Sequence, residues 1–181
     1  MNLINYSSHQ FLQAILAICV GYFAGLVQSA QAVQLADGTI YFAYPPSLLE
    51  ARTTQKAIRA ASTYYFTLDL PANAGSPLER VVFTEQEGRD DIKFELNKTR
   101  AFSSQPSKPQ ILINQMTLLQ KTRMVSVTFT PPISPGQTVT VALHPCHNPA
   151  LTGIYLFGVK AFPQGEKAHG QFLGFGRLYF Y

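Results

Sequence analysis

The 181-residue sequence contains no tryptophan and only two cysteines. Cys19 lies in an apolar N-terminal run, and loss of that run would leave Cys146 alone, so we expect no internal disulfide bond. Stability must then come from burial of aromatic and branched side chains, for which 13 Phe and 9 Tyr supply the surface. The lack of tryptophan, the side chain best suited to stacking on a sugar, weakens the hypothesis of a carbohydrate-binding platform.

Charge is also sparse, since 13% of the residues are Asp, Glu, Lys or Arg and the formal net charge is +4. The sequence has neither a run of about five like charges nor a basic helix, which excludes the usual footprint of nucleic-acid binding. The motifs G-x-S-x-G and H-E-x-x-H and a glycine-rich phosphate loop are missing. We therefore predict a protein that is not an enzyme and needs no cofactor, with an unrecognised envelope hydrolase as an alternative.

An uncharged apolar stretch covers residues 11–27 and is followed by small residues at Ala30 and Ala32. The stretch is short for a membrane span, which needs ~20 apolar residues. The A-x-A pattern is typical of a signal peptidase site. We predict that residues 1–32 form a signal peptide that is cleaved after Ala32, leaving no stable membrane span. Because residues 1–10 contain no lysine or arginine, an uncleaved N-terminal anchor stays open.

Residues 33–181 are enough for one domain with a hydrophobic core. Short strand signals recur between glycine, proline, asparagine and aspartate residues, as in a sandwich or barrel. Residues 33–42 resemble a hairpin around Asp37-Gly38, and residues 64–70 alternate between apolar and mixed positions. We predict an all-β fold, an antiparallel β-sandwich of about 7–9 strands.

One short helix is predicted over residues 48–61, because residues 47–50 have capping-box spacing and a weak apolar stripe follows. Residues 78–84 and 92–96 flank a polar, acidic stretch. These two segments predict a hairpin whose turn, with its acidic side chains, faces solvent.

Three metal-capable side chains, His144, Cys146 and His147, lie close together after a predicted strand. Imidazole and thiolate ligands suit copper or zinc, although the spacing follows no established zinc pattern. A periplasmic copper- or zinc-binding sandwich is therefore the main alternative function.

Other candidate binding residues are aromatic or cationic. Tyr64 and Tyr65, with Tyr41 and Tyr44, are expected to be partly exposed. Arg177 is a cation close to an aromatic C-terminal segment, and Asp69 is a candidate partner for it. We name Tyr64, Tyr65 and Arg177 as candidate binding residues.

Several segments resemble the cyanobacterial secreted proteins that are grouped as domain of unknown function 2808; they include PANAG and PPISPG and lie at residues 64–75, 129–136, 148–149, 155–159, 161–163 and 174–181. The resemblance covers nearly all of residues 33–181. It implies a cyanobacterial source and a place outside the cytoplasm, and it implies no activity. We predict an exported, non-enzymatic binding or structural module of the periplasm, thylakoid lumen or cell envelope, with an unknown protein or envelope partner.

Overall fold

The computed structural model describes residues 32–103 and 110–181 and is built almost entirely of β-strands. Its twelve strands exceed the predicted number of about 7–9, because four of them have only two to four residues. The predicted signal peptide lies, except for Ala32, outside the described residues. In the described ranges, no helix is long and apolar enough to cross a membrane.

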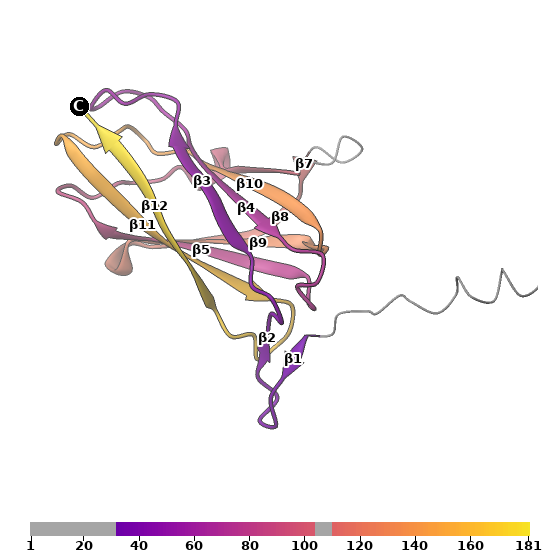
Figure 1. Cartoon of the computed structure of the whole chain (residues 1–181). Coiled ribbons are helices and arrows are strands. Elements are labelled where there is room, and N and C mark those ends of the chain that lie inside the picture. Colours follow the sequence, from indigo (N-terminus) through magenta and orange to yellow (C-terminus); the bar gives the residue numbers. More distant parts are fainter. Residues whose placement is uncertain (1–31, 104–109) are drawn as a thin grey trace, which may run out of the picture.

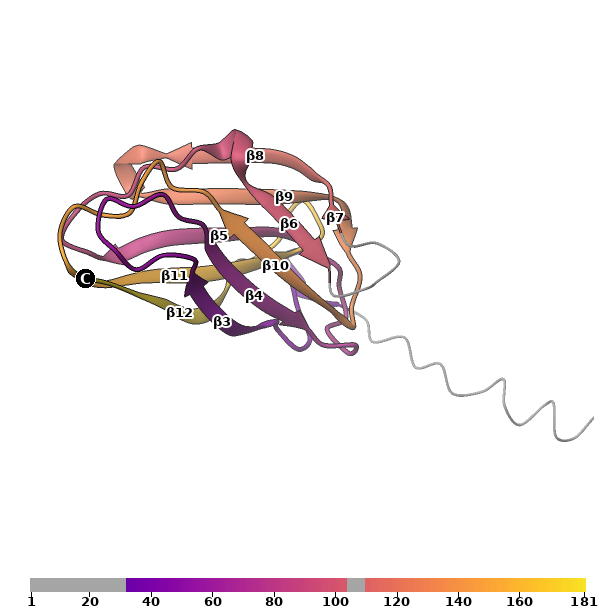
Figure 2. The same cartoon turned by 90° about the horizontal axis from the view of Figure 1, so that it is seen from above.

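Two five-stranded antiparallel sheets face each other (Figures 1 and 2). The first, called the β4 sheet, consists in spatial order of β3 (Ser47–Thr53), β4 (Tyr64–Leu70), β10 (Gln137–Leu143), β6 (Arg100–Ser103) and β7 (Gln110–Ile111). The second, called the β5 sheet, consists of β12 (Gln171–Phe180), β11 (Gly153–Pro163), β5 (Leu78–Glu87), β9 (Met124–Ile133) and β8 (Ile113–Leu119). This arrangement confirms the predicted antiparallel β-sandwich.

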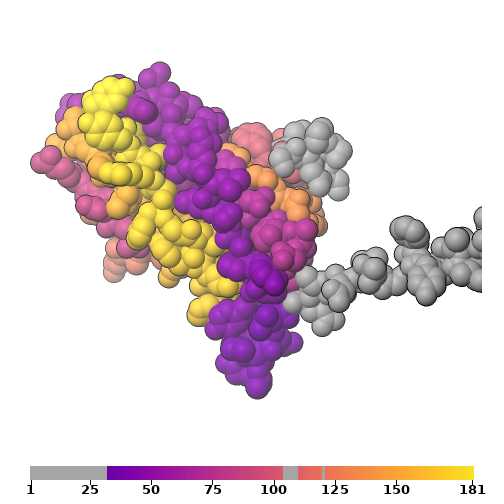
Figure 3. Space-filling model, viewed as in Figure 1, coloured from indigo at the N-terminus to yellow at the C-terminus, as the bar shows by residue number. Residues whose placement is uncertain are grey.

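A small hairpin of β1 (Val33–Gln34) and β2 (Ile40–Tyr41) projects from one end of the sandwich (Figure 3). Its turn is the predicted one, since the Asp37 carboxylate accepts the Thr39 N–H at 2.9 Å. Gly38 takes a φ of 83°, which a residue with a side chain rarely adopts.

The inner faces of the sheets meet in a core rich in aromatic rings. Strand β4 alternates as the sequence predicts, with every second side chain fully buried. Phe66 lies 4.7 Å from Phe83 and 5.6 Å from Phe157 between ring centroids, so the core is joined across the two sheets. Each such ring buries roughly 150–250 Å² and adds directional ring contacts to the area term.

Asn148 is a fully buried polar residue at one end of this core. Its Nδ2 donates to the carbonyl oxygens of Gln55 and Ala57 at 3.0 and 2.7 Å, and its Oδ1 accepts from the Tyr64 hydroxyl at 3.0 Å. Its backbone N–H donates to the oxygen of Ala60 at 2.8 Å. One amide therefore ties residues 55–60, which have no regular structure, to the core.

The predicted helix over residues 48–61 is wrong, because Ser47–Thr53 is strand β3 and pairs with β4. The pairing register shifts between Leu48 and Glu50, a β-bulge that places Leu48 and Ala51 on the same side against the core. A bulge thus produces the three-residue spacing that otherwise indicates a helix. The only helical elements in the described ranges are the 3₁₀ turns Leu96–Lys98 and Gln120–Thr122.

The predicted hairpin between residues 78–84 and 92–96 is also wrong. Strand β5 pairs with β9 and β11, and of residues 92–96 only Phe94 bridges another strand-like segment, at Pro145. Of the acidic side chains between these segments, Glu87 and Asp91 are exposed as the sequence predicts, whereas Glu85 is buried. The Ile92 N–H donates to the Glu85 carboxylate, which ties the end of this segment to strand β5.

The two sheets come closest where β12 runs beside β3, which Figures 1 and 2 both show. Gly176 makes this approach possible. A Cβ atom at this position would lie 2.5 Å from the Phe66 ring and 2.9 Å from Ala51 Cβ. The space that a side chain would need is already filled by the other sheet.

Candidate functional site

On the outer face of the β4 sheet, polar side chains are paired with one another. The pairs are Arg52 over the Tyr65 ring (4.2 Å to its centroid), Thr67 with Thr140 (3.0 Å) and Thr138 with Asp69 (2.9 Å). Arg52 also lies 3.5 Å from the carboxylate of Glu50. These side chains on the outer face of the β4 sheet therefore have polar or charged partners within the protein.

The outer face of the β5 sheet is arranged differently, and its side chains can be placed by strand register. Residues directly opposite one another on paired strands point to the same side of a sheet. One row across the sheet contains Gln115, Thr128, Arg80 and Phe162, and the next contains Thr117, Ser126, Val82, Lys160 and Phe172. The rows bring together residues from five strands that are far apart in the sequence.

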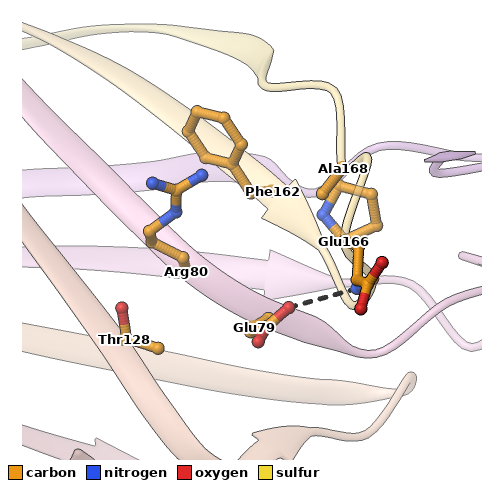
Figure 4. A pocket seen from close by; sticks show the side chains of 8 residues that line it. Glu79, Arg80, Thr128, Phe162, Glu166 and Ala168 are labelled. Carbon is orange, nitrogen blue, oxygen red and sulfur yellow. Dashed lines mark hydrogen bonds between the residues drawn. The ribbon is translucent and has the colours of Figure 1, made fainter. Parts of the chain in front are cut away.

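Two open hollows of about 250 and 290 Å³ lie on these rows, and both include Arg80 and Phe162 in their walls. We call the combined hollow the Arg80 groove and define it by Arg80, Val82, Ser126, Thr128, Lys160 and Phe162. Figure 4 shows the part around Arg80, with Thr128 on the adjacent strand.

The two cations of the groove have no carboxylate partner. The guanidinium of Arg80 lies 4.0 Å from the centroid of the Phe162 ring, a cation–π contact that leaves its outer N–H groups unused. No ion pair of the described residues includes Arg80 or Lys160. Lys160 is exposed, whereas Val82, directly opposite it on β5, is buried.

Hydroxyl groups line the β8–β9 side of the groove. Thr117, Ser126 and Thr128 come from these two strands, and Thr84 lies beside Gly158 and Met124 in the next row. Within residues 32–103 and 110–181, none of these four hydroxyls hydrogen-bonds to another protein group, in contrast to Thr67, Thr138 and Thr140 on the opposite face. They are free to bond to water or to a ligand.

Aromatic rings border the opposite side of the groove. Phe172 and Phe175 project from β12 with exposures of 52% and 54%, and their centroids lie 5.1 Å apart. Gly158 lies directly beside this edge, since a Cβ there would be in ordinary van der Waals contact with Phe172 Cε2, at 3.5 Å. Across the sheet, the groove is therefore bordered by hydroxyl groups on strands β8 and β9 and by aromatic rings on β12, with the two cations between these borders.

One end of the groove is acidic. Glu79 accepts the backbone N–H of Gly165 at 3.1 Å, and Glu166 lies beyond it, as Figure 4 shows. Lys160 lines the other hollow, whose described residues include no acidic side chain.

The sequence-predicted binding residues are dispersed. Tyr64 was expected to be partly exposed but is fully buried in the core, so it cannot contact a ligand. Tyr65 lies on the outer face of the β4 sheet under Arg52. Arg177 is exposed on β12 opposite Leu156, on the same face as the groove. The predicted Arg177–Asp69 pair is wrong, because Asp69 instead accepts a hydrogen bond from Thr138.

The predicted metal ligands are held by separate partners. His144 Nδ1 lies 3.3 Å from Thr63 Oγ1, and His147 Nδ1 lies 2.8 Å from the Asn148 carbonyl oxygen. Cys146 is an exposed free thiol. Among the residues that the structure describes, no three His, Cys, Asp or Glu side chains gather as metal ligands. The copper or zinc hypothesis stays a prediction that elemental analysis can test.

Glu85 is the most unusual titratable group of the described chain. Its side chain is 1% exposed, Oε2 accepts the Ile92 N–H at 3.2 Å, and Oε1 is buried without a hydrogen-bond partner. Arg123, 3.9 Å from Oε1, also pairs with Asp91. Burial raises the pKa of the Glu85 carboxyl, and the Ile92 N–H and Arg123 lower it by less.

This raised pKa predicts a pH-dependent stability. The folded protein holds the Glu85 proton more tightly than the unfolded chain, so Glu85 favours the folded state below its unfolded pKa. That contribution is lost as pH rises through the folded pKa. Urea unfolding between about pH 4 and 8 should give free energies that Glu85→Gln makes less dependent on pH. An unchanged slope in the variant would contradict this role, and Glu87→Gln, an exposed change on the same strand, is the control.

The family model described as "Protein of unknown function (DUF2808)" matches residues 39–180, in agreement with the sequence resemblance. No curated protein matches the chain.

Three solved structures resemble the chain path at low identity. The first is a chain from a structure that contains manganese lipoxygenase of Gaeumannomyces graminis and part of zonadhesin of Komagataella pastoris. It is 6% identical to this protein; the match covers 71% of this chain and 48% of that chain, with a TM-score of 0.42. This protein thus spans about half of that chain. The collagen-binding domain of a Staphylococcus aureus adhesin is 8% identical (74% and 93% covered, TM-score 0.40). A Nocardia farcinica protein with an immunoglobulin-like fold is 12% identical (72% and 96% covered, TM-score 0.44).

Proposed function

Since this chain belongs to the family of unknown function DUF2808, we propose its function from its own surface: it is an exported, non-enzymatic module that binds an envelope ligand through the Arg80 groove. The observation that carries the proposal is the difference between the two outer faces. On the outer face of the β4 sheet, Arg52 pairs with Glu50, Arg100 donates to two backbone carbonyls, and three threonine hydroxyls are hydrogen-bonded. On the β5 sheet, neither Arg80 nor Lys160 has an ion pair or a side-chain hydrogen bond among the described residues.

Binding fits this groove better than catalysis. A hydrolytic site needs a nucleophile beside a base, or two carboxylates held together. The described residues that line the two hollows include no His, Cys or Asp. Their two carboxylates are Glu79, which accepts the Gly165 N–H, and Glu166, and no side-chain hydrogen bond or ion pair of the described residues holds Glu166 in place beside Glu79. The hydroxyls of Ser126 and Thr128 have no basic side chain bonded to them.

Export is supported by the sequence of residues 1–32, with its apolar run and A-x-A pattern. Within the described residues Cys146 is a free thiol, so the domain is stabilised by its core, in which aromatic rings gather around Phe66. The module would then meet its ligand in the periplasm, the thylakoid lumen or the envelope itself.

Cosedimentation with isolated cell envelopes tests this function. The purified protein should pellet with envelopes, and Arg80→Gln/Lys160→Gln should weaken the association at least about tenfold, since charge-assisted contacts are lost. Arg52→Gln/Arg100→Gln removes the same charge from the β4 sheet and is the matched control. Equal retention of both double variants would reject the groove as the binding surface.

A further inference from the structure

We infer that the ligand of the Arg80 groove is an acidic polysaccharide, a chain of sugar rings bearing carboxylate or sulfate groups. The inference rests on the proposed function and adds the chemical class of the ligand. It replaces the sequence-based expectation that a chain without tryptophan is poorly suited to sugars.

The two cations of the groove favour a ligand that carries acidic groups. Arg80 and Lys160 lie on neighbouring strands and are diagonal neighbours, because Lys160 is directly opposite Val82, two residues along β5 from Arg80. Side chains in such a diagonal relation are about 7–8 Å apart at their Cα atoms and can contact one extended ligand. A carboxylate or sulfate would accept charge-assisted hydrogen bonds from either cation, and no protein carboxylate competes for them.

The hydroxyl groups on strands β8 and β9 can hydrogen-bond to the uncharged hydroxyls of a sugar. Thr117, Ser126 and Thr128 each present a group that both donates and accepts, as a sugar hydroxyl does. Their lack of protein partners leaves this capacity for the ligand. Three such hydroxyls on adjacent strands match a ligand that is rich in hydroxyl groups along its length.

The exposed aromatic rings on strand β12 can pack against the ring faces of a sugar. The exposed rings of Phe172 and Phe175 have negative π-faces on which sugar C–H groups, which are partly positive, can pack. Tyr179 continues the exposed aromatic row along β12 with an exposure of 51%. Phenylalanine and tyrosine thus serve here in place of the missing tryptophan.

A protein partner fits the groove less well. The centre of a protein–protein interface is depleted in lysine and serine, yet Lys160 and Ser126 lie at the centre of this groove on either side of Val82. A nucleic acid fits less well too, because Glu79 and Glu166 close one end and two cations give a weak electrostatic footprint. The acidic end instead suits sugar hydroxyls, which can donate to a carboxylate.

Affinity electrophoresis with defined polymers tests the inference. Polygalacturonate, a uronic-acid polymer, should retard the protein, whereas its fully methyl-esterified form, which keeps the sugar chain but not the charge, should retard it at least about tenfold less. Polyglutamate, which is equally charged but contains no sugar, is the second comparison. Equal retardation by the methyl ester, or by polyglutamate, would overturn the inference. Dextran sulfate beside dextran provides the same comparison for sulfate groups, and retardation by either acidic polymer supports the inference.

Two sets of variants separate the charged from the sugar contacts. Arg80→Gln/Lys160→Gln should weaken binding of the acidic polymer at least about tenfold, with Arg52→Gln/Arg100→Gln as control. Phe172→Ala/Phe175→Ala should weaken it several-fold without changing its dependence on salt, because no charge is removed. Circular dichroism melting verifies that each variant is folded. If the phenylalanine variant binds as the parent does, the sugar-stacking part is wrong.

The two proposals can fail separately. Envelope binding that depends on Arg80 and Lys160, without binding to any acidic polysaccharide, would reject the ligand class and leave the binding function standing. Envelope binding that ignores the groove substitutions would reject the proposed function itself.

Discussion

Replacing Asn148 with aspartate is expected to lower the free energy of unfolding by about 4 kcal/mol, because a buried amide becomes an unpaired carboxylate. The new oxygen would face the carbonyl oxygens of Gln55 and Ala57, to which Nδ2 now donates at 3.0 and 2.7 Å. For a domain of this size the change corresponds to a fall in Tm of about 8–16 °C, measured by calorimetry.

Asn114→Asp is the matched control, since the same chemical change at this exposed position of β8 should shift stability by no more than about 0.5 kcal/mol. The Asn148→Asp variant should partly recover at low pH, where its carboxyl is protonated. A variant that melts with the parent at neutral pH would show that Asn148 does not hold residues 55–60.

Gly176→Ala is expected to destabilise the protein by about 2–3 kcal/mol, although it adds a single methyl group. That methyl would lie 2.5 Å from the Phe66 ring and 2.9 Å from Ala51 Cβ, so either β12 or Phe66 must move. Chemical unfolding of the variant should show a lower midpoint with an unchanged denaturant slope.

A double-mutant cycle identifies the cause. Phe66→Leu alone removes buried aromatic surface, but together with Gly176→Ala it makes room for the methyl group, so the combined loss should fall short of the sum by at least about 0.5 kcal/mol. Additive losses would mean that the alanine acts through Ala51 or the backbone of β12 and not through Phe66.

The sequence predicts the sandwich where burial follows the two-residue period, as in β4, and where turn residues mark a hairpin, as at Asp37-Gly38. The sequence-based prediction fails where the two-residue period of burial is interrupted. The bulge near Leu49 gives β3 a helix-like spacing. A similar error arises at Glu85, because a buried charge is indistinguishable by sequence from the solvated acids around it.

The candidate site was largely beyond prediction. No sequence motif marks the residues of the groove, which come from separate segments of the chain. Only the strand register places Ser126 and Lys160 in one row across the sheet and Arg80 in the adjacent row. Pairing between strands that are distant in sequence leaves no local signal. The outward direction of Arg177 could be predicted, since it lies between the inward-facing residues Gly176 and Leu178 of the last strand. This direction places Arg177 on the outer face of the β5 sheet, which also carries the groove.

Under the function proposed above, the unlike outer faces of the sandwich determine how many ligand chains one copy of the protein can bind. A monomer with one ligand-binding face can coat an acidic polymer but cannot bridge two polymer chains, because its β4 sheet would point away from the ligand with its polar groups already paired. Crosslinking would require a second copy, whereas side-by-side copies on one chain would each bind with the affinity of a single site. Light scattering should therefore show decorated polymer chains without a growing network as protein is added.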